Sequence, residues 1–335
     1  MPPAVTILLS TYNRAEMLSR VIRTVRAQTR EDWLLWVIGD HCTDDTEARV
    51  AAFDDPRITM INLPERFGEQ AGPNSVGMAL AETEFVAFLN HDDYWLPNHL
   101  ETALRALETT DADMVWTRAA AFQNRGPRTD RAFFTTVSPL NRTLADAYCG
   151  TSRYLEPTST WVARRSLLNR VGPFRLSNAA TLRPLRDYVK RLLDAGCVLH
   201  ADPVVTVLND WMTVLAAKNE TAPPIYALSG EFAETWLQQI EAGDVTGLLE
   251  DIEQDVWLAT HLGMALDLSA ELFPMSRHWG DAYETTGLDA VELAFIASGR
   301  KAGRPLEELT RRLSGDAVFQ PPDLDAVIAA VRARL

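Results

Sequence analysis

The sequence contains few cysteines and no long apolar run. Only three of its 335 residues are cysteine, and Cys42, Cys149 and Cys197 stand far apart, which argues against a disulfide framework or a cysteine-rich zinc site. No apolar stretch approaches the roughly 20 residues that cross a bilayer. The first residues also lack the basic and apolar pattern of a signal peptide. We therefore expect a cytoplasmic protein without a transmembrane segment.

Basic residues are scarce beside acidic ones, and the formal net charge is −14. Residues 223–335 contain 19 acidic and 8 basic side chains, whereas residues 1–222 contain 27 and 24. Phosphate backbones and anionic lipids repel such a chain, which argues against a nucleic-acid-binding or membrane-surface function. The change in charge predicts two domains, 1–222 and 223–335, and the second has a helical pattern throughout.

Glycine is missing where two classes of nucleotide-binding enzyme need it. No G-x-G-x-x-G occurs in the chain, which excludes a Rossmann dehydrogenase. Residues 10–16, directly after the first expected strand, contain no glycine at all. A sugar-phosphate nucleotidyltransferase usually has a glycine-rich phosphate loop there, so this class is a less favoured alternative.

Short apolar runs alternate with helical patterns through the first third of the chain. The strand-like runs are residues 5–9, 33–38, 57–63, 85–89 and 114–116. Apolar residues at helical spacing separate several of these runs, as at positions 18, 21, 22 and 25. This alternation predicts an α/β fold with a mostly parallel sheet flanked by helices.

Three polar clusters follow three of the expected strands, at residues 10–14, 39–45 and 90–93. Open parallel sheets bind ligands beyond the carboxyl ends of their strands, so these clusters should meet in one crevice. The adjacent carboxylates of Asp92 and Asp93 repel each other unless a cation neutralises them, and Mg²⁺ or Mn²⁺ takes carboxylate and phosphate oxygens. The third cluster thus predicts a metal–diphosphate site. The first two could also be a helix cap and a turn without a ligand.

The order and spacing of these motifs resemble an inverting glycosyltransferase of family 2, with the GT-A fold, over roughly residues 4–222. The matching segments are 9–14, 40–46, 77–93, 95–97, 164–167, 171–174 and 186–187. The resemblance implies transfer of a sugar from a nucleotide-sugar donor, typically UDP-linked, to an acceptor hydroxyl with inversion. It also implies Mn²⁺ or Mg²⁺ as the cofactor. The acceptor stays open among saccharides, lipids, peptides and small natural products.

The resemblance also assigns residue roles. Asp187 matches the catalytic base, and Asp92 would hold the metal ion on the donor diphosphate. The argument from the adjacent carboxylates adds Asp93 as a second metal ligand. The expected contacts to the donor nucleotide are Ser10, Thr11, Tyr12, Asp40, Asn90, His91 and Asp92.

Three positions depart from the family pattern. Asn90 replaces the first acid of the Asp-x-Asp element, and Arg186 replaces the glutamate before the base. Asn74-Ser75 replaces an Arg-Asn pair, so Arg14 or Arg66 would have to supply the missing cation. These departures keep open a catalytically inactive relative that serves as a binding or scaffold protein.

Aromatic and polar residues outside these motifs give further expectations. Trp95 is a candidate for stacking on a sugar, and Trp257 is expected in the core. His200 and the cluster Asn209-Asp210-Trp211 are candidates for a third metal ligand or an acceptor contact. Apolar residues beyond one helical stripe indicate that residues 223–335 either brace the first domain or form a homodimer, which we favour. These apolar residues are Trp236, Leu237, Trp257, Phe273, Trp279 and Phe295.

Overall fold

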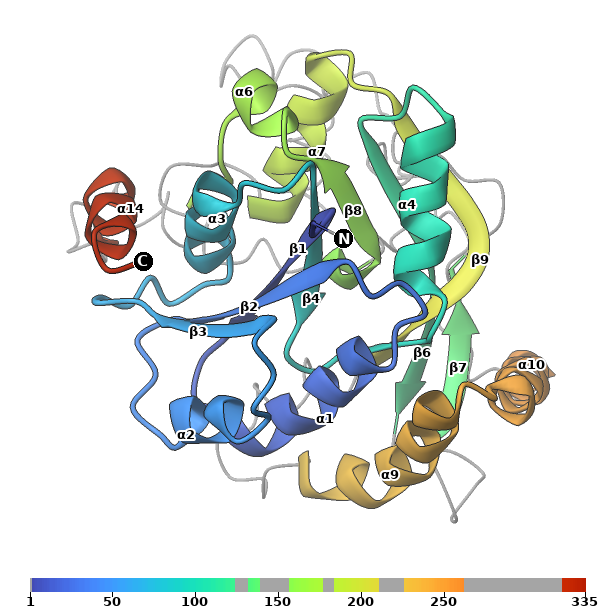
Figure 1. Ribbon diagram of the computed structural model, residues 1–335. Helices are drawn as coiled ribbons and strands as arrows, with labels where there is room; N and C mark the ends of the chain where they lie inside the picture. The colour runs from blue at the N-terminus through green and yellow to red at the C-terminus, as the bar shows by residue number, and fades with distance from the viewer. Residues whose placement is uncertain (1, 124–131, 139–156, 177–183, 211–225, 262–320) are drawn as a thin grey trace, which may run out of the picture.

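The computed structural model describes residues 2–123, 132–138, 157–176, 184–210, 226–261 and 321–335 (Figure 1). Its strands are β1 (Val5–Thr11), β2 (Trp33–Gly39), β3 (Ile58–Asn62), β4 (Phe85–Asn90), β5 (Tyr94–Trp95), β6 (Met114–Gln123), β7 (Phe133–Val137), β8 (Trp161–Arg164) and β9 (Leu199–Asp210). Its helices are α1 (Ala15–Arg26), α2 (Thr46–Ala51), α3 (Ala71–Leu80), α4 (His99–Thr109), α6 (Leu167–Val171), α7 (Pro184–Asp194), α9 (Tyr226–Ala242), α10 (Thr246–His261) and α14 (Leu324–Arg332). A short 3₁₀ helix, η1 (Thr158–Thr160), precedes β8.

The strands form one mixed sheet in the order β3-β2-β1-β4-β8-β6-β9-β5, with β7 paired to β6. The first four of these strands are parallel to one another, and β8 runs antiparallel to both β4 and β6. The strands predicted from the apolar runs are confirmed, and so is the α/β fold with helices around the sheet. Because β1 lies between β2 and β4, the ends of these three strands are neighbours.

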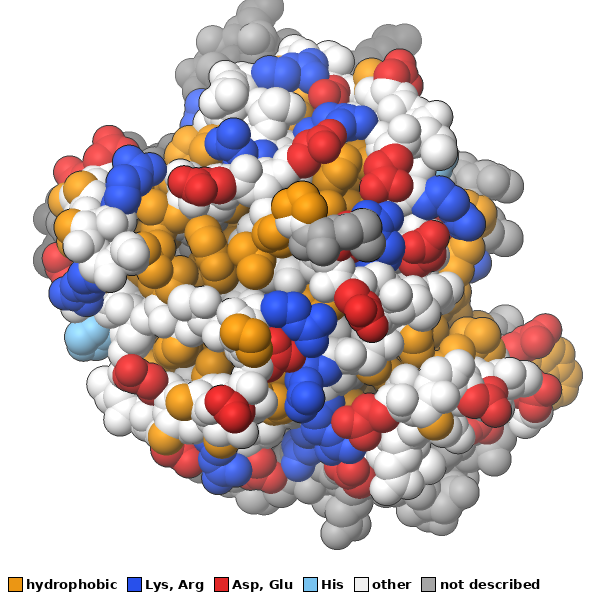
Figure 2. All heavy atoms as spheres, in the orientation of Figure 1, with side chains coloured by type: hydrophobic (Ala, Val, Ile, Leu, Met, Phe, Trp, Pro, Cys, Tyr) orange, Lys and Arg blue, Asp and Glu red, His pale blue; other side chains and the backbone are white. Residues whose placement is uncertain are grey.

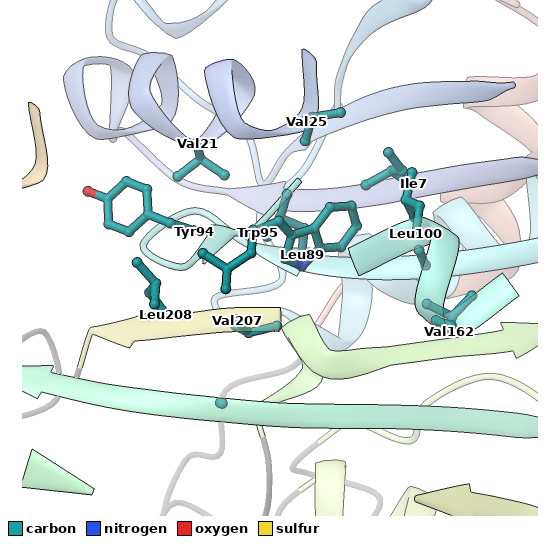
Figure 3. Packing of buried hydrophobic residues seen from close by; sticks show 14 of the residues in the cluster. Ile7, Val21, Val25, Leu89, Tyr94, Trp95, Leu100, Val162, Val207 and Leu208 are labelled. Atoms are coloured by element: carbon teal, nitrogen blue, oxygen red, sulfur yellow. The ribbon is translucent and has the colours of Figure 1, made fainter. Parts of the chain in front are cut away.

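Both faces of the sheet are buried, and alternation along β1 separates them. Ile7 and Leu9 belong to a core that includes side chains of α1 and α4, whereas Leu8 belongs to a second core with α3, α7 and α14. Figure 3 shows part of the first core, in which the side chains converge between α1 and the strands. None of the helices in the described ranges is long and apolar enough to span a membrane.

Helices of the 223–335 region pack on the sheet domain. Trp236 of α9 stacks on Phe134, with ring centroids 4.9 Å apart, and meets Phe122 edge-on at 5.1 Å. Val327 and Val331 of α14 join the core that contains α3, and Figure 1 shows these two helices side by side. These contacts favour the brace. The predicted homodimer stays a prediction, because Phe273, Trp279 and Phe295 lie outside the described residues.

An arginine of α1 ties α9 to the sheet domain from the outside. The Arg23 guanidinium binds both carboxylate oxygens of Glu234 and both of Glu241, at 2.7–2.9 Å. The hydrogen bonds that Arg23 donates to Glu241, and next those to Glu234, raise the pKa of Arg23, and the same bonds lower the pKa of both carboxyls. Figure 2 shows basic and acidic side chains side by side over this part of the surface, where Figure 1 places α1 and α9.

Two tryptophans of the 223–335 region provide a matched test of the brace. Trp236 is 3% exposed, whereas Trp257 is 61% exposed, so the expectation that Trp257 lies in the core is wrong. We expect Trp236→Ala to lower the free energy of unfolding by about 3–5 kcal/mol, because it leaves a cavity against Phe122 and Phe134. Trp257→Ala should change it by less than about 0.5 kcal/mol. Urea unfolding of both variants measures the difference, and equal effects would contradict the brace.

A buried histidine gives the fold a defined response to acid. His99 of α4 is fully buried, its ring stacks on Trp95 at 4.2 Å, and its Nδ1 lies 2.8 Å from Thr206 Oγ1. Burial lowers the pKa of His99 to about 3. The unfolded chain, with a histidine pKa of about 6.5, therefore takes up this proton first as the pH falls. The stability that neutral His99 contributes is complete above about pH 6.5 and declines towards pH 3.

We expect this decline to reach about 2 kcal/mol between pH 6.5 and pH 5, since each pH unit corresponds to about 1.4 kcal/mol. Urea unfolding at pH 7 and pH 5 should thus show a smaller pH dependence for His99→Gln than for the wild type. His261→Gln, at an exposed position, is the control for the replacement of a histidine by glutamine. Other groups titrate alike in all three proteins and cancel in the comparison. An unchanged slope for His99→Gln would exclude this explanation.

Candidate active site

The three predicted polar clusters meet in one cavity at the carboxyl ends of β1, β2 and β4. Thr11 pairs in register with Gly39, and Ser10 with Asn90, so the three strands end together. The cavity has a volume of about 340 Å³. Its lining residues are Ser10, Thr11, Tyr12, Arg14, Asp40, Arg66, Gly68, Glu69, Gln70, Pro73, Asn90, His91 and Asp92. All seven residues predicted to contact the nucleotide are therefore brought together.

The first cluster contributes a buried hydroxyl and an aromatic ring. Among the described residues, the Thr11 hydroxyl has no hydrogen-bond partner, although the residue is only 3% exposed. The Arg66 guanidinium lies 3.7 Å from the centroid of the Tyr12 ring, a cation–π contact. Asn13 has a positive φ of 50°, and its side-chain amide binds the backbone N–H and the hydroxyl of Thr43. This joins the first cluster to the second.

Asp40 directly follows β2 and binds the loop that contains Phe67 and Gly68. Its two carboxylate oxygens accept the backbone N–H groups of Phe67 and Gly68, each at 2.7 Å. Burial raises the pKa of Asp40, and these two hydrogen bonds oppose the shift. Gly68 has a φ of +75°, a backbone conformation that residues other than glycine rarely adopt. These two hydrogen bonds to Asp40 thus fix the loop that carries Arg66 into the cavity. No local sequence pattern predicted this role of Asp40.

The two adjacent carboxylates of the third cluster have different surroundings. Asp92 is partly exposed and lines the cavity beside Asn90 and His91, and His91 Nδ1 lies 3.3 Å from the carbonyl oxygen of Ser10. Asp93 is completely buried and does not line the cavity. Burial, and next the charge of Asp92, raise the pKa of Asp93.

The geometry does not fit the prediction that Asp93 holds the metal ion. Asp93 Oδ1 accepts Asn209 Nδ2 at 2.7 Å and the backbone N–H of Asp210 at 3.3 Å. Asp93 Oδ2 accepts the Ser159 hydroxyl at 2.5 Å and Asn90 Nδ2 at 2.9 Å. Four donors thus occupy the carboxylate away from the cavity, so only Asp92 of the acidic pair can face a ligand there.

Comparison with known proteins identifies the family. Residues 6–172 match the family model described as glycosyl transferase family 2. The chain belongs to this family. The matched segment begins in β1 and ends just after α6, so it contains all three clusters of the cavity.

Relatives and solved structures agree with this assignment. The uncharacterized glycosyltransferase alr2836 of Nostoc is 30% identical over 201 residues, which are 58% of each chain. A β-1,3-glucosyltransferase of Escherichia coli, WfgD, is 35% identical over 97 residues, 29% of this chain and 38% of its own. The chain therefore spans less than two thirds of these relatives. Staphylococcus aureus TarS 1–349, a solved structure, has a TM-score of 0.51 at 16% identity over 95% of this chain and 93% of its own, which supports the GT-A fold.

The cavity of this family 2 chain fits a cation shared with a ligand rather than a cation held by protein alone. In the described ranges, no three histidine, cysteine, aspartate or glutamate side chains are grouped to hold a metal ion. Mg²⁺ and similar ions are commonly held by one or two carboxylates plus phosphate oxygens and water. Three carboxylates line the cavity, those of Asp40, Glu69 and Asp92, and the Asp92 carboxylate is compatible with such a site if a diphosphate supplies further oxygens.

Asp187, which matches the family's base, lies in the first turn of α7 and is 8% exposed. It does not line the cavity. Its carboxylate binds Arg191 Nε at 2.8 Å and Arg175 Nη1 at 3.3 Å. The two cations beside Asp187 are thus Arg191, one turn later in α7, and Arg175, which precedes the helix. The side chain of Arg186 lies outside the described residues.

Two further expectations have different outcomes. Trp95 is completely buried, and its Nε1–H donates to the carbonyl oxygen of Ser159 at 2.7 Å, so the expectation that it stacks on a sugar is wrong. Asn209 and Asp210 do lie near the acidic element, but they contact it through Asp93. Trp211 lies outside the described residues. Sequence reasoning missed Ser159, because a lone serine 66 residues from Asp93 carries no recognisable signal.

Proposed function

We propose that this protein is a glycosyltransferase that moves a sugar from a nucleoside-diphosphate sugar to an acceptor hydroxyl with inversion. The observation that carries the proposal is the cavity at the ends of β1, β2 and β4. It joins an aromatic ring, a buried carboxylate, two arginines and the partly exposed Asp92. Such a mixture suits a ligand with a base, a ribose and a charged diphosphate.

The donor is proposed to be UDP-linked. Tyr12 and Asp40 would contact the base, and Ser10, Thr11, Asn90 and His91 would line the rest of the nucleotide pocket. Arg14 and Arg66 line the same cavity and provide positive charge for the diphosphate, which Asn74-Ser75 cannot. WfgD is named for the use of UDP-glucose, and TarS has been solved with UDP-GlcNAc.

The proposed reaction needs one carboxylate at the donor and one at the acceptor. Asp92 would hold Mn²⁺ or Mg²⁺ against the donor phosphates, where a divalent ion neutralises the charge that develops on the leaving diphosphate. Asp187 would accept the proton of the acceptor hydroxyl. The hydroxyl oxygen then bonds to the anomeric carbon from the face opposite the diphosphate, and the nucleoside diphosphate leaves with the electrons of the broken bond.

A saccharide acceptor is the first to test. WfgD is named for adding glucose to GlcNAc-diphosphoundecaprenol, and the Rhizobium meliloti relative ExoW, 35% identical over 117 residues, is named for succinoglycan biosynthesis. A lipid, a peptide and a small natural product are the other acceptor classes to include.

The experiment is a panel of UDP-, GDP- and dTDP-sugars, each with and without Mn²⁺, read first by thermal shift. A ligand at about 100 times its Kd stabilises the native state by roughly 2.7 kcal/mol. Donors that bind are then incubated with acceptors, and release of the nucleoside diphosphate is measured. Binding without release would favour the scaffold alternative. Formation of a nucleotide sugar from a sugar phosphate and a nucleoside triphosphate would favour a nucleotidyltransferase.

A further inference from the structure

The amide of Asn90 is bonded on both sides by the protein. Its Nδ2 donates to Asp93 at 2.9 Å, and its Oδ1 accepts the Thr158 hydroxyl at 2.9 Å. Its backbone N–H donates to Ser159 Oγ, which in turn donates to Asp93. Asn90 thus lines the donor cavity, while its polar atoms connect to residues behind it.

Asp93 links three separate parts of the chain. Its oxygens receive donors from Asn90 at the end of β4, from Ser159 of η1 and from Asn209 at the end of β9. The last two are 66 and 116 residues away in sequence. Burial of a carboxylate costs free energy unless hydrogen-bond donors surround it. The position of Asp93 therefore requires that its neighbours donate hydrogen bonds to it.

This requirement explains why position 90 carries an amide where the family pattern has an acid. An aspartate at position 90 would place a second acceptor about 2.9 Å from the Asp93 carboxylate, where the wild-type side chain supplies a donor. Asparagine has the same shape and supplies the N–H that Asp93 accepts.

We propose that Asn90 and Asp93 form a matched positioning pair for glycosyl transfer, in which the amide of one and the carboxylate of the other hold the turn carrying Asp92 against η1 and the end of β9. The inference rests on the proposed function, because positioning is defined by its effect on that reaction. Neither residue is a ligand of the metal ion. The departure from the family pattern at Asn90 is required for activity in this chain and does not mark an inactive relative.

The test is an exchange of the two side chains, with turnover of the best donor sugar as one measurement. We expect Asn90→Asp to lower kcat by about 10²-fold, because displacing a reacting group by about 1 Å can have this effect. The double variant Asn90→Asp/Asp93→Asn reverses the direction of the hydrogen bond. It should recover at least about tenfold of the loss, as coupled neighbours do.

Affinity for UDP in excess chelator separates positioning from general damage. Ser159 and Asn209 do not line the cavity, so the Kd for UDP should stay within about threefold of wild type in Ser159→Ala and Asn209→Ala. Asp255→Asn is the matched control, since Asp255 is also fully buried and accepts a backbone N–H, that of Phe134 at 3.2 Å. This control should lower thermal stability and leave kcat unchanged.

If Asn90→Asp does not fold, Ser159→Ala and Asn209→Ala each remove one donor and should lower kcat about tenfold at unchanged UDP affinity. An Asn90→Asp variant as active as wild type, or more active, would overturn the inference, and so would a double variant without recovery. A wild-type protein that turns over no nucleotide sugar would overturn the proposed function and this inference with it. The two failures are therefore distinguishable.

Discussion

Replacement of Asp92 by asparagine is expected to lower nucleotide-sugar turnover by about 10²–10³-fold while the protein stays folded. Asp92 is the carboxylate of the acidic pair that lines the cavity, whereas Asp93 is enclosed by four donors. A divalent ion contributes several kcal/mol of charge stabilisation to such a reaction, and each 1.4 kcal/mol corresponds to about tenfold in rate. Steady-state rates over a series of Mn²⁺ concentrations measure the effect.

Asp45→Asn is the matched control for Asp92→Asn. Asp45 is the last residue of the second cluster and precedes α2, and it forms an exposed ion pair with Arg49 at 2.9 Å without lining the cavity. It should keep wild-type rates and Mn²⁺ dependence. Full turnover of the wild type in excess chelator would refute the metal role of Asp92.

Replacement of Asp187 by asparagine is expected to lower kcat by about 10²–10⁴-fold and to change donor affinity only a few-fold. The amide keeps the shape of the side chain and can still accept a hydrogen bond from Arg191 or Arg175, but it cannot take the acceptor proton. A base acts in the transition state more than in donor binding, so the change should appear in kcat.

Asp194→Asn on the same helix is the control for this second prediction. Asp194 is exposed and pairs with Lys190 at 2.7 Å, one turn away. It should leave kcat unchanged. Near wild-type kcat in Asp187→Asn would mean that another group takes the proton.

The sequence predicted the cavity well because its parts are local. Each polar cluster directly follows an apolar strand, and parallel strands bring such segments to one edge of the sheet, so Ser10, Asp40 and Asn90 could be grouped without a structure. Local sequence does not determine which aspartate of the acidic pair faces the cavity. Asp92 and Asp93 are adjacent and chemically identical, and only distant partners such as Asn209 distinguish them.

The predictions for Trp95 and Trp257 were wrong for a related reason. Trp95 follows the acidic element and Trp257 lies on an apolar helical pattern, but the first is buried and the second is exposed. Periodicity along one helix says which residues share a face, not which face meets the sheet. The Arg23 bridge to Glu234 and Glu241 spans more than 200 residues of sequence and has no local signal either.

The packing of α14 on α3 has a consequence for biosynthesis. About 240 residues separate the end of α3 from the start of α14. At about 5–20 residues per second, a ribosome needs roughly 12–50 s to add them. During that interval the surface of α3 that finally meets Val327 and Val331 lacks this cover, although β1 and β2, which α3 contacts, are already synthesised. Nascent chains arrested before residue 321 should therefore present an apolar face that a chaperone can recognise.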